Sequence, residues 1–164
     1  MYKNKRGSLT FRDKEGKFAV SIDSTQVARL LKQCIDAGEY ETGGILMGVY
    51  NEKLDTATVT RIVDAPIDSR RGRNWFHRGI SGLQVLILAL WSRRGYYLGE
   101  WHYHPQGSPE ASAVDIRQMK EIASSRGYQC PEPILLIIGG NPKDVWSVQV
   151  TVFKRSGGSP IRLV

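Results

Sequence analysis

His102-Tyr-His104-Pro105, followed after six residues by Ser112-Ala-Val-Asp115, is the stretch from which the fold of this chain is deduced. An extended strand points residues i and i+2 to one face, so His102 and His104 converge there, and Pro105 ends the strand. Ser112 is a good helix N-cap, and Asp115 in the first turn points back toward the strand end. Two imidazoles and a carboxylate can share one zinc ion whose fourth position stays open to water.

Upstream of this stretch, the pattern predicts an amphipathic helix between strands. Ser24 is a suitable N-cap, and Gly38 is a suitable stop. The apolar residues between them recur at helical spacing: Val27, Leu30, Leu31, Cys34 and Ile35. Residues 18–22, 45–50 and 56–63 are predicted strands, the last because of its β-branched side chains.

The middle of the chain predicts a loop and then an apolar helix. Residues 67–78 are polar and rich in Gly and Arg, and they carry Trp75 and Phe76. A lone histidine is more often structural than a ligand, and this is our interpretation of His77. Residues 83–91 are apolar almost all round, which predicts a helix between layers rather than on the surface.

Downstream, residues 96–101 are the predicted strand that delivers the two histidines. The helix that starts at Ser112 is expected to run through Ser125, with Gly127 as its stop. Its expected buried side is Ile116, Met119, Ile122 and Ala123. Residues 133–140 and 145–153 are further strands, the second with Trp146, Val148, Val150 and Val152 on one face. This order predicts an α/β (α+β) fold with a mixed β-sheet flanked by helices.

Length and composition predict a single domain over residues 1–164. The chain is long enough to bury a hydrophobic core without disulfides, and its two cysteines show no disulfide or CxxC pattern. The net charge of +7 is scattered over several segments, among them 3–6, 70–73 and 93–94, which favours acidic protein partners over nucleic acid. No apolar run follows the basic N-terminus, and none is long enough to cross a bilayer, so a cytoplasmic protein without membrane contact is expected.

Together with Glu41-Thr-Gly-Gly-Ile-Leu-Met-Gly48 upstream, the His-x-His-Pro and Ser-x-x-Asp motifs resemble the JAB/MPN domain with a JAMM zinc motif. That family comprises zinc-dependent isopeptidases and their bacterial relatives, with a cytidine deaminase-like fold, and the resemblance spans about residues 18–153. It implies that His102, His104 and Asp115 bind one Zn²⁺ per chain. Glu41 would be the general base, and Ser112 would stabilise the oxyanion.

One position departs from the commonest family pattern, because Tyr103 stands where a serine or threonine is usual. Its side chain should point away from the metal, with consequences for substrate or for packing. Substrate-binding residues are not identified by the motif; Tyr103, Trp75 and Phe76 are the candidates. Glu41 is favoured over the neighbouring Glu39 as the base, because only Glu41 is in register with the Gly-Gly-Ile-Leu-Met-Gly segment.

The compact size resembles the bacterial JAB peptidases, and among them the deconjugating peptidases of CBASS antiphage operons. This implies cleavage between the C-terminus of a ubiquitin-like modifier or conjugated protein, such as a cGAS/DncV-like nucleotidyltransferase, and a target lysine. An E1/E2-like conjugation enzyme and the nucleotidyltransferase of the same operon would be partners. The alternatives are a processing peptidase for a ubiquitin-like or sulfur-carrier precursor, a RadC-like nucleic-acid-associated protein, and a non-catalytic scaffold of the same fold.

Overall fold

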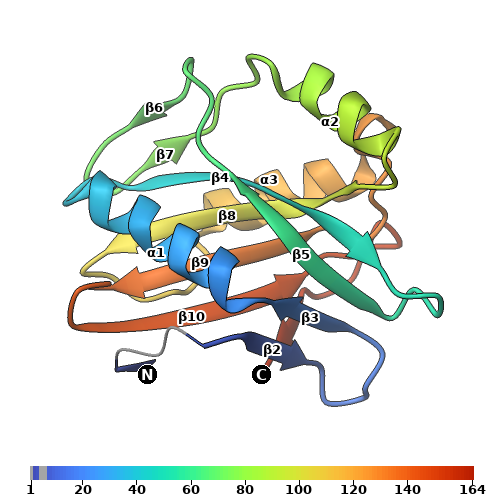
Figure 1. Cartoon of the computed structure of the whole chain (residues 1–164), viewed down its shortest axis with the longest axis horizontal. Helices are drawn as coiled ribbons and strands as arrows, with labels where there is room; N and C mark the ends of the chain where they lie inside the picture. The colour runs from blue at the N-terminus through green and yellow to red at the C-terminus, as the bar shows by residue number, and fades with distance from the viewer. Residues whose placement is uncertain (1, 4–6) are drawn as a thin grey trace.

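The structure is a computed structural model that describes residues 2–3 and 7–164, and its main feature is one large mixed sheet flanked by helices (Figure 1). The predicted α/β architecture is confirmed. The helices are α1 (Ser24–Ala37), α2 (Leu83–Trp91) and α3 (Ala113–Ser124), with a short 3₁₀ helix η1 (Arg126–Tyr128). The basic N-terminal residues 4–6 lie outside the described residues.

In the part of the chain described, nine strands form the main sheet, and two more form a small hairpin. The main sheet contains β1 (Tyr2–Lys3), β2 (Leu9–Arg12), β3 (Ala19–Ile22), β4 (Thr42–Tyr50), β5 (Thr56–Val63), β8 (Tyr96–Pro105), β9 (Ile134–Gly140), β10 (Val145–Val152) and β11 (Ile161–Leu163). Its order is β1-β10-β9-β8-β4-β5-β3-β2, with β11 also on β10. The hairpin is β6 (Arg70–Arg71) with β7 (Phe76–His77), inside the segment predicted as a loop.

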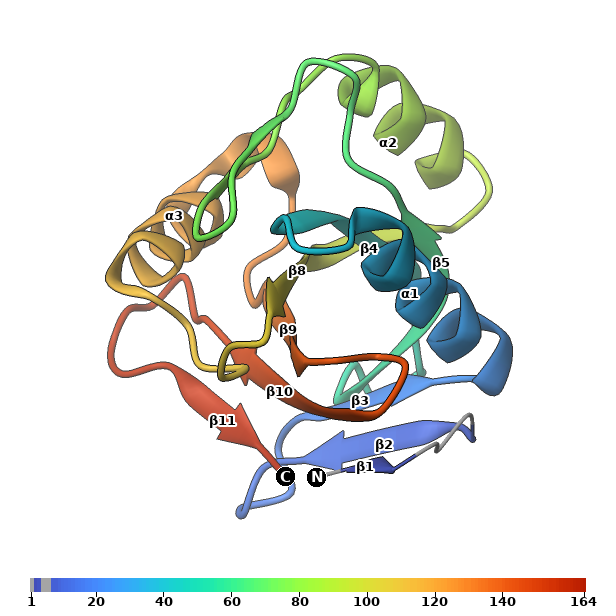
Figure 2. The same cartoon turned by 90° about the vertical axis from the view of Figure 1, so that its left-hand side faces the viewer.

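The central strands β4, β8 and β9 are buried on both faces because helices cover the sheet on each side (Figure 2). The cluster on one face joins α1 to the sheet through residues such as Leu30 and Leu46. The cluster on the other face joins α2 and α3 through residues such as Leu83 and Met119. Strand β8 pairs antiparallel with β4 and parallel with β9, so its C-terminal end is enclosed between two strands.

The helix ends differ in detail from the prediction. Asp23, not Ser24, caps α1, and its side chain accepts the Gln26 backbone N–H at 2.9 Å. Ser112 does cap α3, but the helix ends at Ser124, and Gly127 lies within η1. The reason is that Asp caps as well as Ser, and that the chain tightens into a 3₁₀ turn before the glycine is reached.

Helix α2 lies on the surface, so the prediction that it lies between layers is wrong. Leu83 is buried, whereas Val85, Leu88 and Trp91 are exposed. Apolar composition shows that a helix could be covered on every side, but only the tertiary fold supplies the second layer, and here the sheet covers one side alone. Within residues 2–3 and 7–164 we find no helix with the length and apolar character needed to cross a membrane.

Candidate active site

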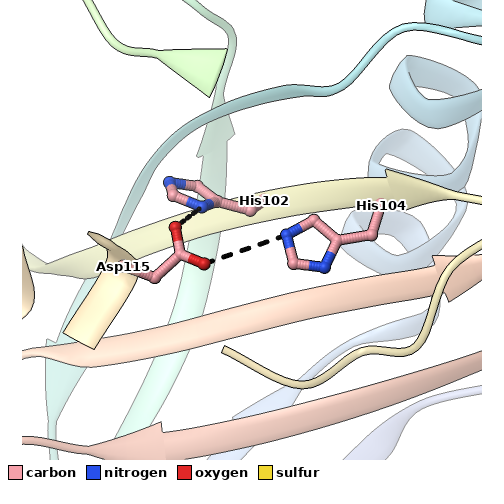
Figure 3. A group of neighbouring side chains, drawn as sticks. All are labelled: His102, His104 and Asp115. Carbon is pink, nitrogen blue, oxygen red and sulfur yellow. Dashed lines mark ion pairs between the residues drawn. The ribbon is translucent and has the colours of Figure 1, made fainter. Parts of the chain in front are cut away.

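Strand β8 presents His102 and His104 on one face at its C-terminal end, as the alternation of a strand requires (Figure 3). His102 is buried and His104 half-buried. Asp115 reaches them from the first turn of α3, and one ligand atom from each of the three residues lies within 4.8 Å of the others. The structure therefore brings the predicted histidines and aspartate together.

The His104 ring is oriented by a backbone carbonyl. Its Nδ1 lies 3.0 Å from the Ser108 oxygen. A carbonyl only accepts hydrogen bonds, so Nδ1 carries the proton and Nε2 has a free lone pair. Nε2 lies 4.0 Å from Asp115 Oδ2 (Figure 3). A histidine whose second ring nitrogen donates to a carbonyl is the usual arrangement of a metal ligand.

Asp115 and Ser112 form a reciprocal capping box at the start of α3. The Ser112 hydroxyl donates to Asp115 Oδ2 at 2.7 Å, the Ser112 backbone N–H donates to the same oxygen at 2.8 Å, and the Asp115 N–H donates to Ser112 Oγ at 3.2 Å. Burial by itself raises the pKa of Asp115, but hydrogen bonds and charge from His102, together with Ser112, hold that pKa well below its ordinary value. The carboxyl is therefore ionised and fixed in direction.

The donor set fits a divalent metal such as zinc. Imidazole nitrogen and carboxylate oxygen bind zinc at about 2.0–2.2 Å, which places two ligand atoms of a tetrahedral site about 3.4 Å apart. His102 Nδ1 and Asp115 Oδ1 lie 3.0 Å apart, and His104 Nε2 and Asp115 Oδ2 lie 4.0 Å apart. These two distances involve different oxygens of Asp115, and one ligand atom of each residue lies within 4.8 Å of the others, so the three side chains are close enough to close in on one ion.

Glu41 directly precedes β4 and lies beside this cluster. In the β4–β8 pairing, Thr42 is opposite Tyr103 and Gly43 is opposite His102, which brings Glu41 next to His104. The side chain is half-buried, and burial raises the pKa of its carboxyl. His104 and His102 lower that pKa, Asp115 raises it, and the net change is upward. The pKa of this carboxyl is affected by all three candidate ligands, so the carboxyl lies close enough to them to transfer protons at the same site.

Residues 24–151 match the model of the prokaryotic homologues of the JAB domain, a range that contains Glu41 and the whole His-His-Asp cluster. The chain belongs to the prokaryotic JAB family. The chain is accordingly an enzyme of the metalloprotease class.

Two relatives agree with this assignment. Over 155 residues the chain is 43% identical to the CD-NTase/cGAS isopeptidase of Enterobacter hormaechei subsp. hoffmannii (strain UCI 50), covering 94% of this chain and 86% of that protein. It is 28% identical to the probable metalloprotease y4qB of Sinorhizobium fredii (strain NBRC 101917 / NGR234), covering 79% of this chain and 84% of the relative.

The JAB fold is also found in a solved structure. The solution structure of protein DSY2949 from Desulfitobacterium hafniense superposes with a TM-score of 0.62 at 19% identity, covering 86% of this chain and 88% of that one. At this identity the likeness is one of fold.

The β6–β7 hairpin packs onto the JAB site. The Phe76 ring meets the His102 ring edge to face, with centroids 5.5 Å apart, and the Glu41 backbone N–H donates to the Gly72 oxygen at 2.9 Å. Gly43 makes this approach feasible, because a Cβ there would lie 2.4 Å from the Trp101 oxygen and 2.7 Å from Phe76 Cε1. The glycine of the Glu-Thr-Gly-Gly motif thus leaves room for the hairpin.

A buried ion pair that the sequence analysis missed anchors the segment leading from the hairpin to α2. Arg78 Nε and Glu100 Oε2 are 2.5 Å apart, and both side chains are almost fully buried. The Tyr97 hydroxyl donates to Glu100 at 2.6 Å, and Arg78 donates to the Tyr128 hydroxyl at 3.0 Å. The available signal was Glu100 itself, since a charged residue in an otherwise apolar central strand requires a buried partner.

The candidate substrate-binding residues differ in how far their side chains are buried. Tyr103 points to the α1 face, is 2% exposed, and donates its hydroxyl to the Gly140 oxygen at 3.2 Å. The role of Tyr103 is therefore packing, and a substrate cannot reach its side chain. Trp75 is exposed at the hairpin, and Phe76 is half-buried. His77 is exposed on β7 and lies outside the metal-ligand cluster of the described residues.

Proposed function

We propose that this JAB chain is a zinc-dependent isopeptidase that cleaves the bond between the C-terminus of a conjugated protein and a target lysine. The observation that carries the proposal is the convergence of His102, His104 and Asp115 beside the Glu41 carboxyl. The proposed conjugated protein is a cGAS/DncV-like nucleotidyltransferase of antiphage defence (CBASS). Support for it is 43% identity to a relative named CD-NTase/cGAS isopeptidase.

One zinc ion per chain is the proposed cofactor, held by His102, His104 and Asp115. The donors are two nitrogens and one oxygen in a half-buried site, and this set suits zinc. Calcium and magnesium prefer sites in which all donors are oxygen. When bound, zinc polarises the scissile carbonyl and lowers the pKa of water at the site to about 7.

Proton transfer is the role proposed for Glu41. Its carboxylate accepts a proton from the attacking water and passes that proton to the departing lysine amine, first as general base and then as general acid. Its raised pKa suits the first step, since a carboxylate with a higher pKa is a stronger base toward the attacking water.

The Ser112 hydroxyl is proposed to stabilise the oxyanion of the tetrahedral intermediate. The hydroxyl now donates to Asp115, and rotation about its C–O bond turns the proton toward the site. Backbone donation from Ser112 N–H keeps Asp115 oriented when the hydroxyl turns. Phe76 and Trp75, on the hairpin beside the site, are proposed to contact the substrate tail.

A precursor-processing peptidase would use the same residues, so the two activities differ only in the linkage that is cut. The RadC-like and scaffold alternatives are less well supported. Glu41 lies within the range matched by the JAB family, and the candidate metal ligands are all present.

The decisive variant is Glu41→Gln, which keeps the shape of the side chain but removes its basicity. With a bacterial cGAS-like nucleotidyltransferase joined through its C-terminal carboxyl to a lysine of a fluorescent protein as substrate, we expect the cleavage rate to fall about 10²–10⁴-fold. Zinc content, measured by plasma emission spectrometry, should stay at one per chain because Glu41 is not a ligand.

Glu39→Gln is the matched control, because Glu39 is a nearby carboxylate that pairs with Arg73 on the surface at 3.2 Å. It should retain wild-type activity. Full activity in Glu41→Gln, or no cleavage by the zinc-loaded wild-type enzyme, contradicts the proposed mechanism. Comparing this substrate with a linear head-to-tail fusion separates isopeptidase from precursor-processing activity.

A further inference from the structure

The outer face of α2 is an apolar surface that no described part of the chain covers. Val85 is 73% exposed, Leu88 58% and Trp91 52%, and Ile80, just before the helix, is 74% exposed. Monomeric proteins rarely leave contiguous apolar patches of several hundred Å² in water unless a partner covers them. We call these four residues the α2 face.

A groove continues the α2 face toward the sheet. The cavity has a volume of about 380 Å³ and lies between α2, the end of β4 and the start of β8. Leu88 and Trp91 form its helix side, and Tyr50, Leu54 and Tyr96 form the opposite side. A partner that covers the α2 face can therefore also insert an apolar side chain beside it.

Arginines border this surface at both ends. Arg70 and Arg71 on the hairpin and Arg93 and Arg94 after α2 are exposed and make no ion pair with acidic side chains of the described residues. Asp68 is the one acidic residue between positions 65 and 96, and its carboxylate accepts the backbone N–H groups of Ile80 and Ser81. The surface is therefore apolar in the middle with four arginines at its edges, and Glu132 is an acidic residue on the far side of the groove.

One anchored segment of the chain joins the α2 face to the active site, and the groove beside α2 lies at the opposite end of β8 from His102 and His104. The hairpin contacts His102 through Phe76. The chain then passes Arg78, which is buried, and Ile80, which is exposed, before it enters α2. Figure 1 shows the hairpin and α2 on the same side of the molecule, above β4. A protein whose tail occupies the site has its folded body within reach of this surface.

From these observations, and resting on the proposed function, we infer that the α2 face and its bordering arginines dock the folded body of the conjugated protein. The partner surface that fits is an apolar patch surrounded by Asp and Glu side chains. A second copy of this chain fits less well, because its arginines would face these arginines and each copy carries a net charge of +7.

The test compares two substrates that share one scissile bond. The first is the nucleotidyltransferase conjugate described above. The second is a peptide of the last residues of that nucleotidyltransferase, joined to the same lysine of the fluorescent protein. Val85→Asp and Leu88→Asp should each lower kcat/KM for the whole conjugate about 10–30-fold, mainly through KM, as expected for a buried interface residue. Cleavage of the peptide substrate should be unchanged.

Val164→Asp is the matched control, since Val164 is also 73% exposed but lies at the opposite end of the fold, beside Arg12. It should cleave both substrates like the wild type. Raising the salt concentration should weaken cleavage of the whole conjugate more than cleavage of the peptide.

The outcomes separate the two proposals. If the wild type cleaves neither substrate, the proposed function is wrong. If it cleaves both, and the α2 variants cleave the whole conjugate as fast as the wild type, the docking inference is wrong. A wild-type dimer in light scattering that Val85→Asp dissociates assigns the face to a second copy and also overturns the inference.

Discussion

At the level of single residues, the site contains two carboxyls with opposite tendencies. Burial raises the pKa of Glu41, whereas hydrogen bonds from His102 and Ser112 outweigh burial and lower the pKa of Asp115. Such a separation assigns different roles to two acids in one site. The carboxyl whose pKa is raised suits acid–base work, and the one that stays ionised suits metal binding.

The raised pKa of Glu41 predicts how activity depends on pH. Because the base must be deprotonated, the rate should fall on acidification; burial of Glu41 moves this fall to higher pH, and the charge of a bound zinc ion moves it to lower pH. A kcat/KM profile over roughly pH 4–9 checks this, with zinc saturating at each point. A kcat/KM that does not fall toward the acid end while zinc stays bound contradicts the assignment of Glu41 as the base.

Ser112 has two functions that different substitutions separate. Ser112→Ala should lower kcat about 10²–10³-fold by removing an oxyanion donor, and should cost about 1 kcal/mol of unfolding free energy by removing the cap. Ser112→Gly removes the hydroxyl and offers no other side-chain donor, but glycine is tolerated at an N-cap at a cost of a few tenths of a kcal/mol, so its stability should stay near that of the wild type while kcat remains low. Denaturant titration and steady-state kinetics measure the two effects. Equal kcat in Ser112→Gly and wild type would remove the oxyanion role.

Gly43 lies at a position of the site that has no space for a larger side chain. In Gly43→Ala the new methyl group meets the Trp101 backbone oxygen, which cannot move without disturbing β8, and the Phe76 ring. We expect a weaker zinc affinity and a lower melting temperature, measured by chelator competition and calorimetry. Gly127→Ala is the control, since a Cβ there approaches only Ser125 Oγ, at 3.6 Å. Similar losses in both variants would mean that the effect is not specific to the site.

At the level of elements, the hairpin and the segment after it depend on the Arg78–Glu100 pair. A charge left alone in the interior is costly, because burial removes its hydration while no partner replaces it. Burial raises the pKa of Glu100, and Arg78 and Tyr97 oppose that rise. The pair therefore holds the segment that carries Phe76 and leads into α2.

Removing one member of this pair should destabilise the protein strongly. Arg78→Met is expected to cost about 3–5 kcal/mol of unfolding free energy, and adding Glu100→Leu should recover most of the loss because no lone charge remains. Arg73→Met, which breaks an exposed pair with Glu39, should cost no more than about 1 kcal/mol. Urea titrations of the four proteins check the order. A double variant no more stable than Arg78→Met would show that packing, not charge, dominates.

At the level of the whole molecule, a metal held by His102, His104 and Asp115 would connect β8 to α3, so its binding should stabilise the fold as well as support catalysis. Zinc at a free concentration 100 times its dissociation constant should add about 2.7 kcal/mol of unfolding free energy. Chelation should abolish cleavage and lower the melting temperature, and added zinc should restore both. In His102→Ala, zinc should no longer shift the melting temperature. A zinc-induced shift of wild-type size in that variant would place the ion elsewhere.

Much of the fold follows from the pattern of the chain. The alternation of β10 and the period of α1 both predicted elements that are present, because each reflects one buried face of a single element. The exposure of α2 could not be predicted in this way. Its residues look the same whether one layer or two cover the helix, and that choice depends on the surrounding chain.

The convergence of His102 and His104 could be predicted from strand alternation, and the N-cap at Ser112 from the residues of a single helical turn. The position of Glu41 beside His104, the packing of Phe76 on His102 and the pairing of Arg78 with Glu100 became known only from the folded chain. Those contacts depend on which strand pairs with β8 and on where the hairpin folds back. Local geometry is set by neighbouring residues, whereas contacts between distant segments are set by packing of the whole chain.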